Sequence, residues 1–180
     1  MNLFLPEISL AAVAILVILA DLFVQRKSIL AGISVAGLVV SAILALTMWG
    51  GAAQSIFNNN LAVDNFALVF KLLFAGIAIL VILASMDYVG KMARFQGEYF
   101  ALILLSTLGM MLMASAADLI TIYLAIELTV LPICALVALL KDQKSTEAGL
   151  KYVLLSAVIS AVMLFGMALV FGVTGKTQIS

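Results

Sequence analysis

The chain has 180 residues, of which 66% are hydrophobic and only 10% are charged, whereas soluble domains are about 45–50% apolar and about 25% charged. Nine basic residues balance nine acidic ones, which argues against nucleic-acid binding. Histidine is absent and cysteine occurs once, so the chain lacks the usual ligands of haem, iron–sulfur clusters and zinc, and we expect no cofactor or metal site in it.

Six long apolar segments dominate the rest of the sequence. A helix that spans the hydrocarbon core of a bilayer needs about 20 apolar residues. Six segments meet this requirement and predict transmembrane helices at residues 3–24, 29–49, 65–84, 99–116, 119–140 and 150–173. We therefore predict an all-α, polytopic helix bundle that forms a single transmembrane domain over residues 1–180.

The basic residues between these segments predict an orientation. The first segment has no basic stretch before it, so it reads as an uncleaved helix rather than a signal peptide. Alternate loops are basic, whereas the opposite side holds only Lys176. The positive-inside rule then places the N-terminus outside, in the periplasm if the chain lies in the inner membrane of a bacterium. The basic loop residues are Arg26, Lys27, Lys91, Arg94, Lys141 and Lys144.

Local signals agree with these helices. Asp64 precedes the third segment and Asp118 precedes the fifth, where each side chain is placed to accept from free backbone N–H groups as an N-cap. Small residues recur at four-residue steps, which predicts close helix packing and nothing more specific. They are Gly37, Ser41 and Ala45 in the second segment and Ser156 and Ser160 in the sixth.

The fifth segment contains one charged residue, Glu127. It lies eight residues after Leu119, about 12 Å along a helix, which is too deep for its short side chain to reach the headgroups. Pro132 cannot donate to the carbonyl of Leu128, so an unpaired carbonyl is expected next to the carboxyl group. We interpret Glu127 as a candidate proton site; the alternative is a glutamate that only locks helix packing.

Two lysines also lie within predicted spans. Lys151 begins the sixth segment, where it can extend to the interface or pair with Glu147 at i,i+4, so the residues alone leave its role open. A direct ion pair with Glu127 is not expected, because their predicted depths differ by about 10 Å. Lys71 is the weakest proton-pathway candidate. It lies seven residues after Asp64, and extension of its side chain to the outer face is the favoured interpretation.

Several stretches resemble a known family. The sequences GEYFALILLSTLGMMLMASAADLITIYLAIEL (97–128) and STEAGLKYVLLSAVISAVMLFGMALVFGVTG (145–175) resemble subunit N of bacterial proton-pumping NADH:quinone oxidoreductase, complex I. LPEISLAAVAILVILADLF (5–23) and VDNFALVFKLLF (63–74) resemble the start of the same subunit. Antiporter subunits of multisubunit sodium/proton exchangers are more distant relatives. The resemblance extends along nearly the whole chain in the same order.

The resemblance implies an antiporter-like fold with two inverted five-helix repeats. Its fifth-helix glutamate in an LELxxLP setting is matched by IELTVLP, which implies a proton-pathway role for Glu127. Its sixth helix opens with LKY, as at Leu150 to Tyr152, which favours Lys151 as a second pathway residue. NADH, flavin, iron–sulfur clusters and quinone would then bind other subunits of the enzyme complex. The implied partners are the other membrane subunits and the lipid bilayer.

One departure from the family is large. The family continues for more than twice 180 residues, and the lysine that partners the fifth-helix glutamate lies on a seventh helix, beyond Ser180. We therefore expect this sequence to be a part of a longer protein that does not build a complete proton path. Two alternative functions stay open: a subunit of a cation/proton antiporter, and a purely structural or assembly protein.

Overall fold

The structure is a computed structural model that describes residues 4–23, 28–51, 54–56, 60–92 and 95–179. It contains six helices long and apolar enough to cross a membrane, which confirms the predicted polytopic helix bundle. In chain order they are α1 (Leu5–Phe23), α2 (Ser28–Thr47), α3 (Asn65–Gly90), α4 (Gln96–Ser115), α5 (Leu119–Val137) and α6 (Gln143–Thr174).

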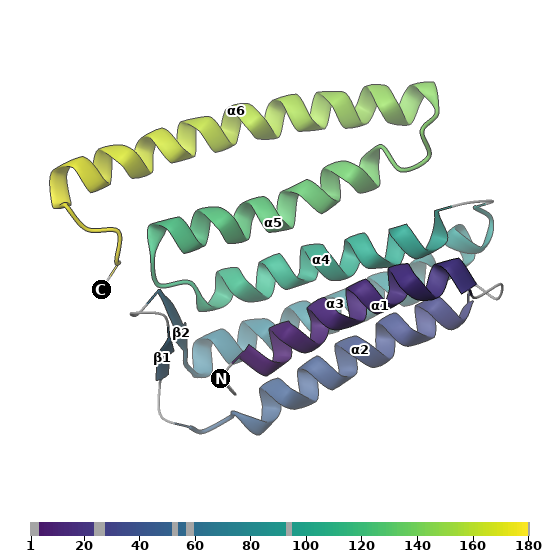
Figure 1. Cartoon of the computed structure of the whole chain (residues 1–180), viewed down its shortest axis with the longest axis horizontal. Helices are drawn as coiled ribbons and strands as arrows, with labels where there is room; N and C mark the ends of the chain where they lie inside the picture. Colours follow the sequence, from purple (N-terminus) through teal and green to yellow (C-terminus); the bar gives the residue numbers. More distant parts are fainter. Residues whose placement is uncertain (1–3, 24–27, 52–53, 57–59, 93–94, 180) are drawn as a thin grey trace.

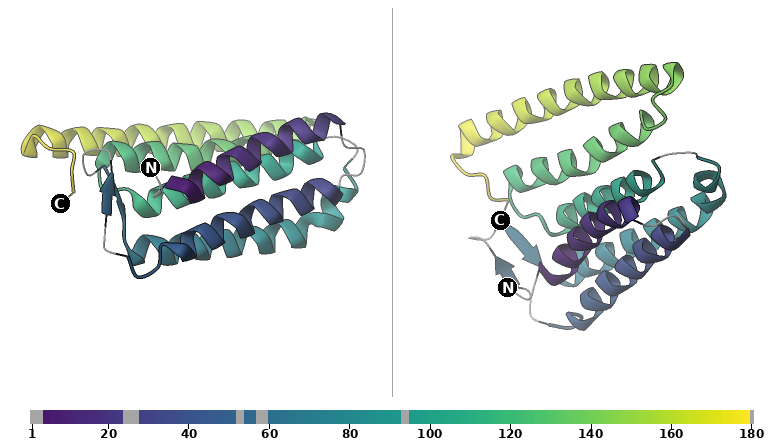
Figure 2. Two further views of the ribbon diagram at one scale, coloured as in Figure 1. Left: turned by 60° about the horizontal axis from the view of Figure 1, so that its bottom comes forward. Right: turned by 45° about the vertical axis from the view of Figure 1, so that its right-hand side comes forward.

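The first four helices form a closed group. Around it, α1 contacts α2, α2 contacts α3, α3 contacts α4, and α4 returns to α1. Figures 1 and 2 show α1 and α3 at opposite corners of this arrangement. The main hydrophobic core lies between them and includes Leu10, Leu38, Ile82, Phe100 and Leu104. Residues of α1 and α3 that meet must therefore do so through the centre of the group.

Helices α5 and α6 extend the structure to one side. α5 packs on α4, and α6 packs on α5 at the edge of the molecule (Figure 1). The α4–α5 contact is close at Gly109, where an added Cβ would lie 2.5 Å from Thr129 Oγ1 and 2.6 Å from Thr129 N. Only glycine fits there without moving the α5 backbone. α6 buries only one residue, Gly149, among those that the structure describes.

Short extended segments close the end of the molecule that holds both chain termini. Strands β1 (Gln54–Ile56) and β2 (Leu61–Val63) form an antiparallel hairpin, which the sequence analysis had treated as a loop. Leu61 also forms a bridge with Ala116, and Asp118 forms one with Gln178. The C-terminal segment thus returns to the turn between α4 and α5.

The helix starts follow the predicted capping with one correction. Asp64 accepts from Ala67 N at 2.7 Å, and Asp118 accepts from Ile120 N at 3.0 Å, so both predicted N-caps are confirmed. The sixth helix, however, begins at residue 143 and not at residue 150. Asp142 forms a capping box with Ser145 there, which starts the helix two turns earlier than the apolar pattern indicated.

Neighbouring helices run in opposite directions, so the turns alternate between the two ends (Figure 1). The α1–α2, α3–α4 and α5–α6 turns share one end, with Lys91, Lys141 and Lys144 among the described residues. Arg26, Lys27 and Arg94, which also supported the predicted orientation, lie outside the described residues. Which end faces the cytoplasm stays a prediction.

Candidate functional site

Glu127 lies in the middle part of α5 and faces α6. Its side chain is half-buried, and its Oε1 accepts a hydrogen bond from the Ser160 hydroxyl of α6. Among the residues that the structure describes, none forms an ion pair with Glu127. The bounds of α5 place Glu127 eight residues, or about 12 Å along the axis, past the start of the helix.

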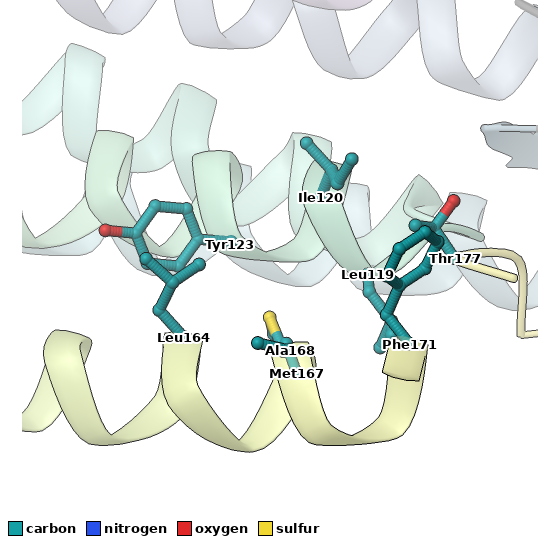
Figure 3. Close-up of a pocket in the computed structure, with 8 residues that line it drawn as sticks. All are labelled: Leu119, Ile120, Tyr123, Leu164, Met167, Ala168, Phe171 and Thr177. Carbon is teal, nitrogen blue, oxygen red and sulfur yellow. The ribbon is translucent and has the colours of Figure 1, made fainter. Parts of the chain in front are cut away.

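Among the described residues, two contacts between polar side chains join α5 and α6. One helical turn before Ser160, the Ser156 hydroxyl lies 3.6 Å from the Cys134 sulfur atom. Toward the other end, α6 presents Leu164, Met167 and other apolar side chains to α5 (Figure 3). The Glu127–Ser160 contact therefore lies between the Ser156–Cys134 contact on one side and apolar side chains of α6 on the other.

The opposite side of α5 is fixed against α4. Ser106 Oγ donates to the Thr129 carbonyl oxygen at 3.1 Å, and Thr129 Oγ1 donates to the Ala125 carbonyl oxygen at 2.8 Å. An added Cβ on Gly109 would lie 2.8 Å from the carbonyl carbon of Leu128. The carbonyl group that Pro132 leaves without a helical donor thus belongs to a stretch packed on α4, whereas the Glu127 carboxyl group faces α6.

An apolar pocket of about 250 Å³ lies between α5 and α6, toward the end that holds the chain termini (Figure 3). It is lined by Leu119, Ile120, Tyr123, Leu164, Met167, Ala168, Phe171 and Thr177. Figure 3 shows the Tyr123 ring with its hydroxyl directed toward the Leu164 end, away from Leu119 and Thr177. Because Glu127 follows Tyr123 by one helical turn, the phenol group points toward the level of the carboxyl group.

Lys151 is in a different environment from Glu127. It pairs with Glu147 at i,i+4, and the two side chains are 73% and 62% exposed. It lies nine residues before Ser160 on α6, about 14 Å along the helix axis. The structure therefore keeps Lys151 apart from Glu127, and the prediction that they form no direct ion pair is confirmed.

Lys71 does not extend to the outer face, so that interpretation was wrong. Its side chain is fully buried, and its Nζ lies 2.6 Å from Oε1 of Glu7, whose side chain is 4% exposed. The contact crosses between opposite corners of the α1–α4 group. Apart from it, Glu7 and Lys71 have no hydrogen-bond partner for their charged atoms within the described part of the chain.

Packing explains why Lys71 stays inside. The α1 helix starts deep in the group, because the Pro6 carbonyl oxygen accepts from Ser41 Oγ of α2 at 2.9 Å. Toward the end that holds the chain termini, a second apolar cluster of Ala45, Val63 and Leu68 lies next to the pair. A lysine side chain can reach the interface only along an open surface, and here β2 and α2 close that route.

Two residues of these contacts were missed in the sequence. Glu7 is not among the candidates that the sequence suggests, because no pattern in the sequence pairs it with a lysine 64 positions later. Ser160 was assigned to helix packing, although its four-residue spacing from Ser156 placed both serines on one face of α6. That shared face was the available signal for Ser160.

These features define the class of the protein. The described residues hold no group of three or more His, Cys, Asp and Glu side chains that could bind a metal ion. Six apolar helices, with one carboxyl group and one ion pair inside them, define a multi-pass membrane protein with ionisable residues within its spans.

Comparison with known proteins identifies the family. The chain is 46% identical to NADH-quinone oxidoreductase subunit N of Dehalococcoides mccartyi over 99% of its own length, and 40% identical to that of Trichlorobacter lovleyi over 100%. It spans 37% of the length of each of these relatives. Residues 116–180 match the family model described as NADH:quinone oxidoreductase/Mrp antiporter, TM. The chain is thus similar over its whole length to part of NADH-quinone oxidoreductase subunit N, the family that it resembles in sequence.

Solved structures share the helix arrangement. Respiratory complex I from Thermus thermophilus contains a chain that matches with a TM-score of 0.78 and 29% identity, over 100% of this chain and 38% of that one. A chain of the archaeal membrane-bound sulfane sulfur reductase matches with a TM-score of 0.76 at 24% identity, over 98% of this chain and 37% of that one. The second match bears on the fold alone. The predicted partial antiporter-like fold and the bacterial membrane location are confirmed.

Proposed function

We propose that this chain is part of a membrane subunit of a proton-translocating NADH:quinone oxidoreductase, in which Glu127 binds and releases a proton. The observation that carries the proposal is a half-buried carboxyl group about 12 Å inside a spanning helix, held by a hydroxyl group instead of a cation. Ionisable groups at such depth are costly and usually functional. A carboxyl group without a fixed counter-ion can change its charge without breaking an ion pair.

The lysines take different places in this proposal. Lys151 is a second proton-pathway residue at the α5–α6 turn end, and intervening water links it with Glu127 because about 14 Å of helix separates their levels. Lys71 we assign to its ion pair with Glu7 and leave out of the pathway, because the apolar cluster around Leu68 separates it from the outer end.

The redox chemistry belongs to other subunits. In this proposal NADH, flavin, iron–sulfur clusters and quinone bind elsewhere in the complex, and this chain contributes only to proton transfer driven by quinone reduction. The end with the three basic turns faces the cytoplasm, and the N-terminus lies outside. The partners are other membrane subunits of the complex and the surrounding lipid.

A second candidate function is a cation/proton antiporter subunit. One observation favours it, because the family model that matches residues 116–180 covers both kinds of protein in its description. The relatives that match 99–100% of the chain bear the oxidoreductase name, which favours the first function. Proton transfer that requires NADH and quinone supports the oxidoreductase subunit, and NADH-independent exchange of a cation for a proton supports the antiporter.

The test replaces Glu127 by glutamine in the assembled complex. We expect Glu127→Gln to reduce proton transfer coupled to quinone reduction at least tenfold, since the amide cannot take up the proton. Glu98→Gln is the matched control, because Glu98 is an exposed carboxylate in the first turn of α4. Wild-type coupled proton transfer in Glu127→Gln, at normal assembly, would refute the proposal.

A further inference from the structure

We propose that Ser160 is a positioning residue for Glu127, whose hydroxyl group holds the carboxyl group toward α6 in both its ionised and its protonated form. This inference rests on the proposed function of Glu127 and extends it to a second helix. Three observations support it. The Ser160 hydroxyl donates to Glu127 of another helix, the face of α6 toward α5 is mostly apolar beyond Ser160, and the backbone of α5 next to Glu127 packs closely on α4.

The hydrogen bond of Ser160 differs from those of most helical hydroxyl groups in the protein. Ser34, Thr107 and Thr129 each donate to the carbonyl oxygen four residues earlier in their own helix. Ser156 donates to the Val153 carbonyl oxygen of α6 at 3.0 Å. Such back-bonding is the usual outlet for Ser and Thr within helices. Ser160 instead donates to the carboxylate of another helix.

The face of α6 that meets α5 offers Glu127 no other hydrogen-bond donor at its level. In the described structure this face begins with Ser156 and Ser160 and continues with Leu164, Met167 and Phe171. Ser156 precedes Ser160 by one helical turn, about 6 Å along the axis, and its hydroxyl lies 3.6 Å from the sulfur atom of Cys134, seven residues past Glu127 on α5. Removal of the Ser160 hydroxyl would therefore leave the carboxyl group without its hydrogen-bond donor on α6.

The backbone that carries Glu127 cannot turn away easily. Gly109 lies so close that an added Cβ would be 2.5–2.8 Å from atoms of Leu128 and Thr129, and Ser106 donates to the Thr129 carbonyl oxygen. With the backbone fixed by α4, the direction of the carboxyl group is decided by its side-chain torsions and by Ser160. A group that must exchange protons in a set direction needs such orientation.

A serine hydroxyl can serve both charge states of the carboxyl group. It donates to a carboxylate oxygen when Glu127 is ionised, and it can accept from the carboxyl O–H, after rotation, when Glu127 is protonated. The serine proton stays on the serine in both states, so no proton passes through Ser160. A lysine in the same place could only donate, which would hold Glu127 in the ionised form.

The experiment compares Ser160→Ala, Ser160→Thr and Ser156→Ala in the assembled complex. We expect Ser160→Ala to lower proton transfer coupled to quinone reduction about tenfold, the loss expected for one hydrogen bond to a charged group. Ser160→Thr keeps the hydroxyl and should retain at least half of the rate. Ser156→Ala removes a hydroxyl from the same face one turn away and should match the wild type.

Infrared difference spectra give a readout that a packing defect would not move. The C=O stretching band of protonated Glu127 is identified by its loss in Glu127→Gln. It should move to higher wavenumber in Ser160→Ala and stay unchanged in Ser156→Ala. An unshifted band with a wild-type rate in Ser160→Ala overturns the inference, as does an equal loss of rate in both alanine variants. Wild-type proton transfer in Glu127→Gln overturns the proposed function itself, whereas a wild-type Ser160→Ala beside an inactive Glu127→Gln overturns only the role of Ser160.

Discussion

The buried ion pair between Glu7 and Lys71 leads to a prediction about the stability of the α1–α4 group. Their charged atoms are 2.6 Å apart, the side chains are 4% and 0% exposed, and each charge has only the other as a partner in the described residues. Removing one partner of such a pair leaves an uncompensated buried charge and typically costs about 3–5 kcal/mol. Replacing both partners by apolar residues of similar size is often neutral.

The perturbation is a double-mutant cycle with Lys71→Met, Glu7→Leu and the double variant. We expect each single substitution to destabilise the complex by about 3–5 kcal/mol and the double variant to return to within about 1 kcal/mol of the wild type. The two effects then couple by several kcal/mol, since each single variant carries the cost that the second substitution removes. Thermal melting of the purified complex, together with the level of the subunit in the membrane, ranks the wild type and the three variants by stability.

The matched control is the exposed pair Glu147–Lys151, for which the same measurement should give a coupling of about 0.3–0.5 kcal/mol. Two results would refute the reasoning about the buried pair. One is wild-type stability of both single variants. The other is a double variant as unstable as the sum of its single substitutions, which would show that Glu7 and Lys71 act independently.

Three further substitutions test local features. Gly109→Ala should destabilise the α4–α5 contact by about 1–3 kcal/mol, since its Cβ would meet α5 backbone atoms, whereas Gly76→Ala, with open space around it, should not lower the melting temperature. Asp118→Ala should cost about 1–2 kcal/mol through loss of the α5 N-cap, measured by the same melting experiment. The N–H and hydroxyl of Ser145 hold the pKa of Asp142 below its ordinary value, so this cap stabilises α6 at neutral pH and is lost as the pH falls through the lowered value. Amide exchange at the start of α6 should therefore become faster at low pH in the wild type. Asp142→Ala, which lacks the cap at every pH, should not show this change.

The sequence was sufficient for features that depend on local chemistry. Apolar length predicted the six helices, and the acidic residues before the third and fifth segments predicted the N-caps that Asp64 and Asp118 form. The depth of Glu127 followed from residue counting along one helix. Each of these depends on residues within a few turns of one another, where helix geometry is known in advance.

Features that depend on distant residues were not predicted correctly. The environment of Lys71 depends on α1 starting deep beside Ser41 and on Val63 of the hairpin, and neither follows from the sequence around Lys71. The start of α6 was placed too late, because hydropathy marks the apolar part of a helix and not its capped polar turns. The sequence predicts only a packing role for Ser160, because its contact with Glu127 depends on how α6 lies against α5.

Glu7 and Glu127, two carboxyl groups within the helices, differ in a way that separates a structural role from proton transfer. Glu7 lies against an ammonium group in a closed core, so a change in its charge would leave Lys71 unpaired and cost several kcal/mol. Glu127 contacts a neutral hydroxyl group that can donate or accept, at the edge helix of the described structure. A change in the charge of Glu127 therefore breaks no ion pair among the described residues. This difference in partners, more than depth in the membrane, is the reason to assign proton transfer to Glu127 and a structural role to Glu7.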